Sequence, residues 1–163
     1  MPVDVVRAQP EHGEVLGQLF QLYAYDFSEF VKLDVDEHGR YAGPAFQGYF
    51  GDENCFPYLV QVDGRLAGFA IVRRGSRLCR EDNAWDMEEF FVLRRYRRCG
   101  VGREVACLLF ERHIGWWELR QRRENSVAIA FWRATVDAFT GGEFRETLLD
   151  DERWRGPVQR FCS

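Results

Sequence analysis

The stretch between residues 85 and 112 places the strongest constraint on the fold, because a strand, a turn with two glycines and a helix follow one another there. Residues 85–93 are rich in aromatic and other apolar side chains, which is typical of a strand. Gly100 and Gly102 then give a turn signal, and apolar residues recur at helical spacing as far as Leu109. We therefore predict a mixed α/β fold in which this turn joins a strand to an amphipathic helix.

Periodicity and turn residues predict the other elements. The clearest is a hairpin of strands 56–62 and 66–73, joined by Asp63 and Gly64, a dipeptide that fits a type I′ turn. The remaining predictions are strands at 3–6, 116–121, 144–149 and 158–161, helices at 10–27 and 127–138, and a loop at 34–51 with a short helix at 45–50. No repeat or linker interrupts the 163 residues, so we expect a single domain, residues 1–163.

The helix at 127–138 carries one apolar stripe at helical spacing. The stripe consists of Val127, Ala130, Phe131, Ala134 and Ala138. An apolar stripe of this width normally faces the protein interior. The stripe therefore predicts a helix that ends at Gly141 and Gly142, and for Phe131 we expect core packing.

Composition excludes several classes of function. The formal net charge of −4 argues against a nucleic-acid partner, because non-specific binding to nucleic acids requires a basic surface. The cysteines are odd in number and lack CxxC spacing, so we expect free thiols and no zinc or other metal site: Cys55, Cys79, Cys99, Cys107 and Cys162. Without a signal peptide or a membrane-spanning run, we expect a cytoplasmic protein with no membrane partner.

The turn at 94–103 has the chemistry of an anion-binding site. Glycine lets the backbone approach a ligand closely, and the first N–H groups of a helix have no partner within it. Such groups, with the positive end of the helix dipole, favour a phosphate or pyrophosphate. Arginines add positive charge at the same place: Arg94, Arg95, Arg97, Arg98 and Arg103. A tight strand-to-helix turn without a ligand fits the two glycines equally well.

Two familiar nucleotide-binding motifs do not fit this turn. The dinucleotide-binding fingerprint requires a third glycine three residues after the second, and that position is Val105. A P-loop requires Gly-Lys followed by Ser or Thr, whereas Gly102 precedes Arg103 and Glu104. A nucleotide-binding redox domain is therefore disfavoured.

The stretch resembles the signature of the GNAT (GCN-related N-acetyltransferase) superfamily. That signature is an apolar strand ending in valine, then Arg or Gln, two residues, Gly, one residue, and Gly or Ala. Residues 90–92 match the strand end, and Arg97, Gly100 and Gly102 match the turn. Further matches, in the family's order, are Trp117-Glu118-Leu119, Asn125 and Phe131-Trp132. The resemblance spans nearly the whole chain and implies a central, mostly antiparallel twisted sheet flanked by helices.

The resemblance also implies acetyl-CoA as cosubstrate. In the family, the backbone of the strand end bonds the pantetheine arm and the acetyl carbonyl, and the turn amides hold the pyrophosphate. The cofactor-binding residues implied here are Phe90, Phe91, Val92, Arg97, Arg98, Cys99, Gly100, Val101, Gly102, Arg103 and Asn125. At Cys99 only the backbone is expected to matter.

Acyl transfer to an amine requires a base that removes a proton from the amine. By the two-residue period of a strand, Asp86 and Glu88 share a face with residues 90 and 92, and Glu89 lies on the other face unless a bulge shifts the register. Relatives place the base, or the residue that holds a relay water, at matching positions. The resemblance therefore implies Glu88, then Asp86, as the catalytic base. As solvated acids or arginine partners, these residues would have no such role.

The family's usual general acid is a tyrosine seven residues after the asparagine, and here that position is Trp132. An indole N–H is no proton source for a thiolate. Water remains an alternative, because a thiol with a reference pKa of about 8.5 is a tolerable leaving group. Tyr23 or Tyr25 could also supply the proton.

Two functions are consistent with the sequence. The first is an N-acetyltransferase that acts on an amine of a small molecule, a peptide or a protein. The second is a non-catalytic acyl-CoA sensor of the same fold, which the missing tyrosine permits. The acidic loop at 34–37 either attracts a cationic amine or is simply solvated. Exposed sheet edges make a homodimer plausible.

Overall fold

The computed structural model describes residues 1–78 and 83–163, so the predicted free thiol at Cys79 lies outside the described residues. Every predicted strand and helix is present, with shifts of a few residues at the ends. In chain order, the elements are β1 (Val3–Arg7), a 3-10 helix (Pro10–His12), α1 (Gly13–Phe27), α2 (Gln47–Phe50), β2 (Cys55–Val62), β3 (Arg65–Arg74), β4 (Trp85–Val92), a 3-10 helix (Arg94–Tyr96), α3 (Val101–Arg112), β5 (Trp116–Arg120), α4 (Ser126–Thr140), β6 (Arg145–Asp150) and β7 (Arg155–Cys162).

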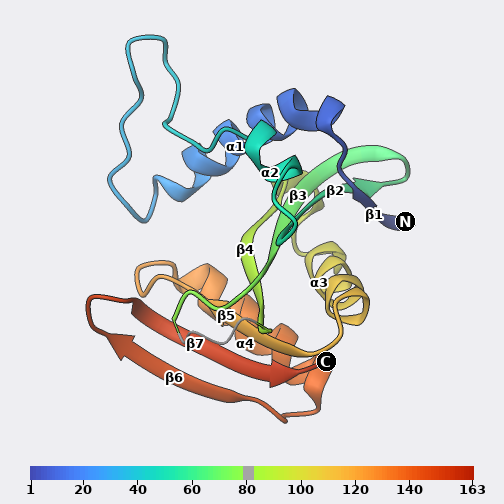
Figure 1. Cartoon of the computed structure of the whole chain (residues 1–163), viewed down its shortest axis with the longest axis vertical. Coiled ribbons are helices and arrows are strands. Elements are labelled where there is room, and N and C mark those ends of the chain that lie inside the picture. The colour runs from blue at the N-terminus through green and yellow to red at the C-terminus, as the bar shows by residue number, and fades with distance from the viewer. Residues whose placement is uncertain (79–82) are drawn as a thin grey trace.

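The strands form one seven-stranded sheet in the order β1-β2-β3-β4-β5-β7-β6. All neighbours are antiparallel except β4 and β5, which are parallel. The predicted hairpin is confirmed: Asp63 and Gly64 have φ angles of 50° and 71°, as a type I′ turn requires. In Figure 1, β1–β3 lie in the upper half of the molecule and β5–β7 in the lower half, with β4 between them.

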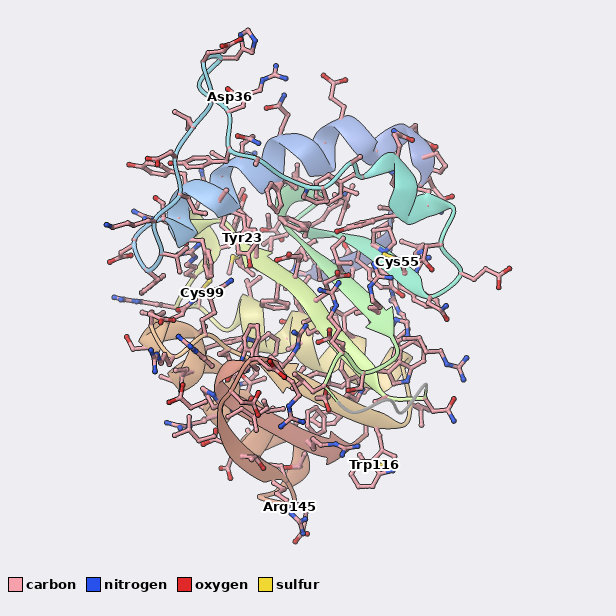
Figure 2. All side chains as sticks on the ribbon, turned by 60° about the vertical axis from the view of Figure 1, so that its left-hand side comes forward. Tyr23, Asp36, Cys55, Cys99, Trp116 and Arg145 are labelled. Carbon is pink, nitrogen blue, oxygen red and sulfur yellow. The ribbon has the colours of Figure 1, made fainter. Side chains whose placement is uncertain are left out.

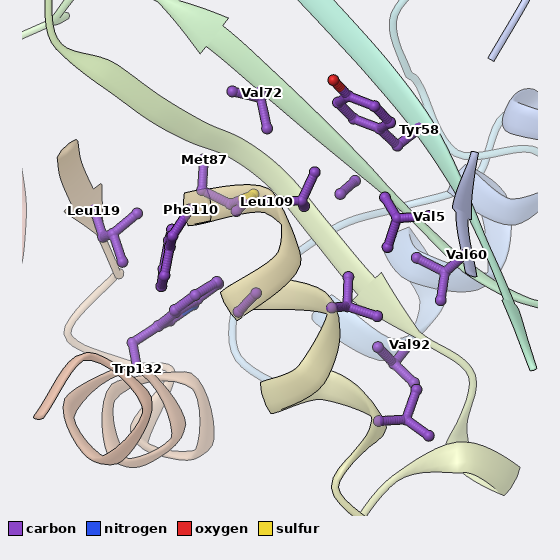
Figure 3. Packing of buried hydrophobic residues seen from close by; sticks show 14 of the residues in the cluster. Val5, Tyr58, Val60, Val72, Met87, Val92, Leu109, Phe110, Leu119 and Trp132 are labelled. Atoms are coloured by element: carbon purple, nitrogen blue, oxygen red, sulfur yellow. The ribbon is translucent and has the colours of Figure 1, made fainter. Parts of the chain in front are cut away.

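Helices cover both faces of the sheet (Figure 1). On one face, called the α1 face here, Leu19 of α1 belongs to a buried cluster with Phe69 of β3. On the other, called the α3 face, Phe110 of α3 and Trp132 of α4 pack in a second cluster that includes Met87 of β4 (Figure 3). The apolar area that these clusters remove from water is the main favourable term in folding.

The helix predicted from the apolar stripe is present as α4, but of the five stripe residues only Phe131 packs beside the core, where it is partly buried. Val127 is 67 % exposed, and the three alanines of the stripe are also exposed. The helix instead buries Trp132 and Val136, with Phe139 partly buried beside them. Large aromatic side chains remove more apolar area from water than alanines do, so they determine which side of the helix faces the sheet.

Residues 28–46 connect α1 to α2 and project from the rest of the molecule (Figure 1). An isolated bridge joins Val35 to Tyr41 within this connection. The Gln21 side chain both donates to and accepts from the backbone of Tyr41, at 2.9 and 2.8 Å. The base of the predicted loop is therefore attached to α1. None of the helices in the described part of the chain has the length and apolar character that crossing a bilayer requires.

Candidate active site

The sheet splits between β4 and β5. These parallel strands pair at only two residues of β4, Trp85 and Asp86. Beyond this point β4 continues to pair with β3 as far as Val92, whereas its other edge has no strand partner among the described residues. Such an edge presents unpaired N–H and C=O groups to a ligand that lies in the split.

The turn that follows β4 has an unusual backbone. Arg98 has a φ angle of 61°, and Gly100 has one of 89°. A left-handed conformation is uncommon for a residue other than glycine, and such conformations concentrate at ligand-binding sites. These two backbone conformations change the direction of the chain after β4. The helix α3 then begins at Val101, whose side chain is buried.

The second part of this turn, residues 98–103, has unpaired backbone N–H groups. Within the described residues, no acceptor receives a hydrogen bond from the N–H groups of residues 98–103. The next N–H, that of Glu104, donates to the carbonyl oxygen of Gly100 at 3.0 Å. The unpaired donors surround the N-terminus of a 12-residue helix, where an anion is favoured. The turn predicted as an anion site thus has the donors that such a site needs.

Gly102 lies beneath an aromatic ring of α4. A Cβ atom at this position would lie 3.1 Å from Cε2 of Phe131. The Phe131 ring also stacks on Phe90, with 5.8 Å between ring centres. The second glycine of the turn therefore allows α4 to pack closely over the end of β4 and the start of α3.

Arg97, which the resemblance placed among the cofactor ligands, is held by groups of the protein. Its Nε donates to the carbonyl oxygen of Val92 at 2.7 Å, and its Nη2 donates to Oδ2 of Asp26 at 2.7 Å. Its backbone N–H donates to the carbonyl oxygen of Arg94, whose guanidinium also donates to Asp26. The carboxylate of Asp26 thus connects the C-terminal end of α1 to the turn, and we expect Arg97 to position the turn.

We expect Asp26→Asn to weaken coenzyme A binding by about fivefold to tenfold, because loss of one anchoring charge lets the turn move. The dissociation constant, measured by calorimetry, checks this. Asp36→Asn in the projecting loop is the control and should bind as the wild type does. Tighter binding by Asp26→Asn would contradict the expectation and show that the released arginines contact the ligand themselves.

The predicted face of the candidate bases is wrong because β4 contains a bulge. Ile71 of β3 pairs with Glu89, but the next residue of β3 pairs with Met87, so Glu88 is the extra residue. A bulge shifts all preceding side chains to the opposite face. Asp86 and Glu88 therefore lie on the α1 face, on the side opposite Phe90. Glu89 is on the α1 face as well.

Arginines neutralise both carboxylates that the resemblance implied as bases. Glu88 accepts hydrogen bonds from Nε of Arg73 at 2.8 Å and from Arg77. Asp86 is 1 % exposed and pairs with Nη2 of Arg120 at 2.8 Å. Burial raises the pKa of Asp86, although the charge of Arg120 opposes that rise. Both carboxylates are thus engaged by arginine side chains of the protein.

Glu89 is the carboxylate that the sequence analysis did not select. Burial raises the pKa of Glu89 to about 7, and the Tyr23 hydroxyl, which donates to this carboxylate, partly opposes the rise. Figure 2 shows Tyr23 below α1, against the sheet. Burial also raises the pKa of Tyr23 well above its ordinary value, and the negative charge of Glu89 adds to this effect. A carboxylate with a pKa near 7 suits general base catalysis.

Aromatic and cationic side chains from three segments surround the α1-face opening of the split. The Cζ atom of Arg122, which follows β5, lies 6.0 Å from the ring centre of Phe27 in α1 and 5.9 Å from that of Trp154. Trp154 lies between β6 and β7, and its Nε1 donates to the carbonyl oxygen of Gln121 at 3.0 Å. The charge of Arg122 slightly opposes the rise in the pKa of Tyr23, so Arg122 lies near the pair formed by Tyr23 and Glu89.

Comparison with known families decides the assignment of the chain. The family model described as "Acetyltransferase (GNAT) family" matches residues 18–135, which is more than half of the chain and includes the split, the turn and most of α4. The chain belongs to the GNAT acetyltransferase family. No curated protein sequence matches the chain.

Solved acetyltransferase structures share the whole fold at low sequence identity. An acetyltransferase from Thermus thermophilus has a TM-score of 0.72 at 15 % identity, and the match covers 100 % of this chain and 98 % of that one. The PaiA N-acetyltransferase of Thermoplasma acidophilum, in complex with coenzyme A, has a TM-score of 0.66 at 12 % identity and 100 % coverage of both chains. Aminoglycoside acetyltransferase AAC(6')-Ib, in complex with coenzyme A and kanamycin, gives 0.67 at 12 % identity, with 99 % and 95 % covered.

The chain departs from the GNAT pattern at the usual tyrosine position. Trp132 is 6 % exposed and packs against Phe90 and Phe110, with 4.9 and 6.3 Å between ring centres. It is a core residue in this member of the family. Asn125 caps α4, since its side-chain oxygen accepts a hydrogen bond from the N–H of Ala128 at 3.0 Å. No sequence signal pointed to the pair of Tyr23 and Glu89, because the packing of α1 against the sheet brings them together.

Proposed function

We propose that this chain is an N-acetyltransferase that transfers the acetyl group of acetyl-CoA to an amine of a small molecule or a peptide. The observation that carries the proposal is Glu89, a partly buried carboxylate with a pKa of about 7 beside Tyr23, at the split in the sheet. A sensor needs only the turn for its ligand. A base with this pKa, placed next to the open strand edge, is what amine acetylation needs in addition.

The turn and the open edge of β4 fit the shape and charge of coenzyme A. The unpaired N–H groups of residues 98–103 would hold the pyrophosphate at the N-terminus of α3. The exposed side chains of Arg98 and Arg103 would add positive charge there. The unpaired edge of β4, from residue 87 to 92, would bond the amide groups of the pantetheine arm as a neighbouring strand does. Bound in this way, acetyl-CoA supplies the thioester-linked acetyl group.

Glu89 would act as the general base. At neutral pH both its protonated and its ionised forms are populated, since its pKa is about 7. The ionised form accepts a proton from the nitrogen of the acceptor amine as that nitrogen bonds to the acetyl carbon. Glu88 and Asp86 remain alternative bases, but their ion pairs support a positioning role, in which they hold Arg73, Arg77 and Arg120 around the site.

Tyr23 would supply the proton that the departing sulfur requires. For a neutral amine, bonds and protons balance. The C–N bond forms as the C–S bond breaks, Glu89 accepts the nitrogen proton, and Tyr23 donates its proton to sulfur. Glu89 then returns a proton to Tyr23, with which it interacts directly. The relay moves a proton from a carboxylic acid to a thiolate, which is favourable because the thiol has the higher pKa, about 8.5. Tyr25 is 66 % exposed on α1 and has no such partner among the described residues.

Two assays on the purified chain test the proposal. Calorimetry with coenzyme A and with acetyl-CoA measures binding at the turn, and release of free thiol from acetyl-CoA in the presence of a panel of amines measures turnover. We expect binding of both ligands and amine-dependent thiol release that increases from pH 6 to pH 8. Binding without thiol release for any amine would favour the sensor. Absence of binding would refute both functions.

We expect Tyr23→Phe to lower kcat by about 100-fold and to move the pH dependence upward, because general acid catalysis is lost and Glu89 loses a donor that lowers its pKa. The rate of thiol release across pH 6 to 9 checks both effects. The control is Tyr25→Phe, which removes an exposed hydroxyl two residues away. A pH profile that does not move would contradict the interaction between Tyr23 and Glu89.

A further inference from the structure

We propose that the acceptor amine carries a carboxylate, as an amino acid or a short peptide with a free C-terminus does, and that Arg122 binds this carboxylate. This inference rests on the proposed function, because it names the acceptor of the same site. It concerns Arg122, Phe27 and Trp154, which border the α1-face opening of the split and which the proposed chemistry does not use.

Arg122 differs from the other arginines around Glu89 in having no carboxylate partner among the described residues. The others are paired with acids of the protein: Arg73 and Arg77 with Glu88, and Arg120 with Asp86. Even the neighbouring Arg123 lies within ion-pair distance of Glu124 and Asp150. Arg122 therefore has a guanidinium that remains available to an anion from outside the protein.

Arg122 is exposed, and two aromatic rings lie near its guanidinium. Its Cζ atom lies between 5.9 and 6.0 Å from the ring centres of Phe27 and Trp154, which belong to different segments of the chain. Trp154 is itself held by its hydrogen bond to the carbonyl oxygen of Gln121. An arginine held over aromatic rings keeps its N–H donors for a ligand, and its planar fork matches a carboxylate. This arrangement favours a carboxylate over a second amine.

The charges of the side chains around Glu89 also favour an acceptor that carries a carboxylate. Three carboxylates lie on the α1 face of β4, but Glu88 and Asp86 are neutralised by arginines, and Glu89 is partly protonated at neutral pH. Arg122 then adds a positive charge that is close enough to Glu124 to lower the pKa of that residue but that forms no ion pair with a described acid. A polyamine would bring several positive charges into this space, whereas an amino acid brings one amine for Glu89 and one carboxylate for Arg122. Like charges in a partly desolvated site repel each other strongly.

The test compares L-amino acids with their own carboxamides as acceptors, using L-phenylalanine, L-leucine and glycine as three matched pairs, with spermidine as a polyamine probe. Each pair differs in the anionic charge and in the basicity of the amine. The carboxamide has the less basic amine and therefore the larger fraction of neutral, reactive amine near neutral pH, so the ionisation of the amine favours the amide and not the acid. We expect kcat/KM for the acid to exceed that for the amide by about 10-fold to 100-fold, as a charge-assisted bidentate contact provides.

The same ratio should fall towards one in Arg122→Gln, whereas Arg123→Gln, which changes the adjacent exposed arginine, should keep the wild-type ratio. Calorimetry of each acid and amide with the coenzyme A-saturated protein gives a second readout that does not need turnover. Equal use of acid and amide, or a preference for spermidine, would overturn the inference but leave the acetyltransferase proposal intact. If the chain is not an acetyltransferase, no amine will cause thiol release. Calorimetry would still show in that case whether Arg122 contributes to binding of the acids over the amides.

Discussion

Glu89→Gln is expected to lower kcat for thiol release at pH 8 by at least about 100-fold, because loss of a general base typically costs between 100-fold and 10,000-fold. The substitution keeps the shape of the side chain and removes its ability to accept a proton. The matched control is Glu88→Gln at the next position, which we expect to lose less than about 10-fold, since Glu88 is held by Arg73 and Arg77. The opposite order of the two effects would assign the base to Glu88, as the family resemblance implied.

A stability measurement separates loss of catalysis from loss of folding in this variant. In the folded protein the pKa of Glu89 is about 7, above the ordinary glutamate value of 4.5. The folded state therefore holds its proton more tightly, so this group's contribution to stability is present below pH 4.5 and is lost as pH rises to 7. Glu89→Gln removes the buried charge, and its melting temperature at pH 8 should equal or exceed that of the wild type. A lower value would attribute the inactivity to misfolding.

Gly102→Val is expected to weaken coenzyme A binding by at least about 100-fold, which corresponds to about 2.7 kcal/mol. A Cβ atom at this position already lies 3.1 Å from the Phe131 ring, and the two methyl groups beyond it would displace this ring and cover nearby N–H groups of the turn. The pyrophosphate would then lose the close backbone approach that the site needs. Calorimetry with coenzyme A measures the effect.

Gly17→Ala is the control for Gly102→Val, because it replaces a helical glycine whose Cβ would meet nothing within 4 Å. We expect it to bind coenzyme A normally and to unfold at the same or a slightly higher temperature, since alanine is the better helix former. Unchanged binding by Gly102→Val would mean that the ligand does not approach the turn at this residue, and the anion-site interpretation would fail there.

Local signals were sufficient to predict the elements of the fold. The hairpin at Asp63 and Gly64 was predictable because a type I′ turn depends on two adjacent residues. The turn around Gly100 and Gly102 was predictable for the same reason, since its donors belong to consecutive residues. Each of these features is encoded within a few positions of the chain.

The parts of the site that sequence reasoning missed depend on contacts between distant segments. One extra residue at Glu88 reverses the face of Asp86, and nothing in the local pattern fixes where a bulge occurs. The pKa of Glu89 depends on its burial beneath α1, and Arg122 meets Phe27 across the split. The orientation of α4 likewise follows from the partners of Trp132, which the helical period alone does not identify.

The short contact between β4 and β5 has a mechanical consequence. Because only two residues of β4 pair across it, the backbone ladder barely connects the sub-sheet β1–β4 to the sub-sheet β5–β7–β6. Side-chain packing also joins the two halves, for example where Phe110 of α3 contacts Trp117 and Phe161. We therefore expect the two sub-sheets to move relative to each other about the short β4–β5 contact, and a ligand bound between them to restrict this motion.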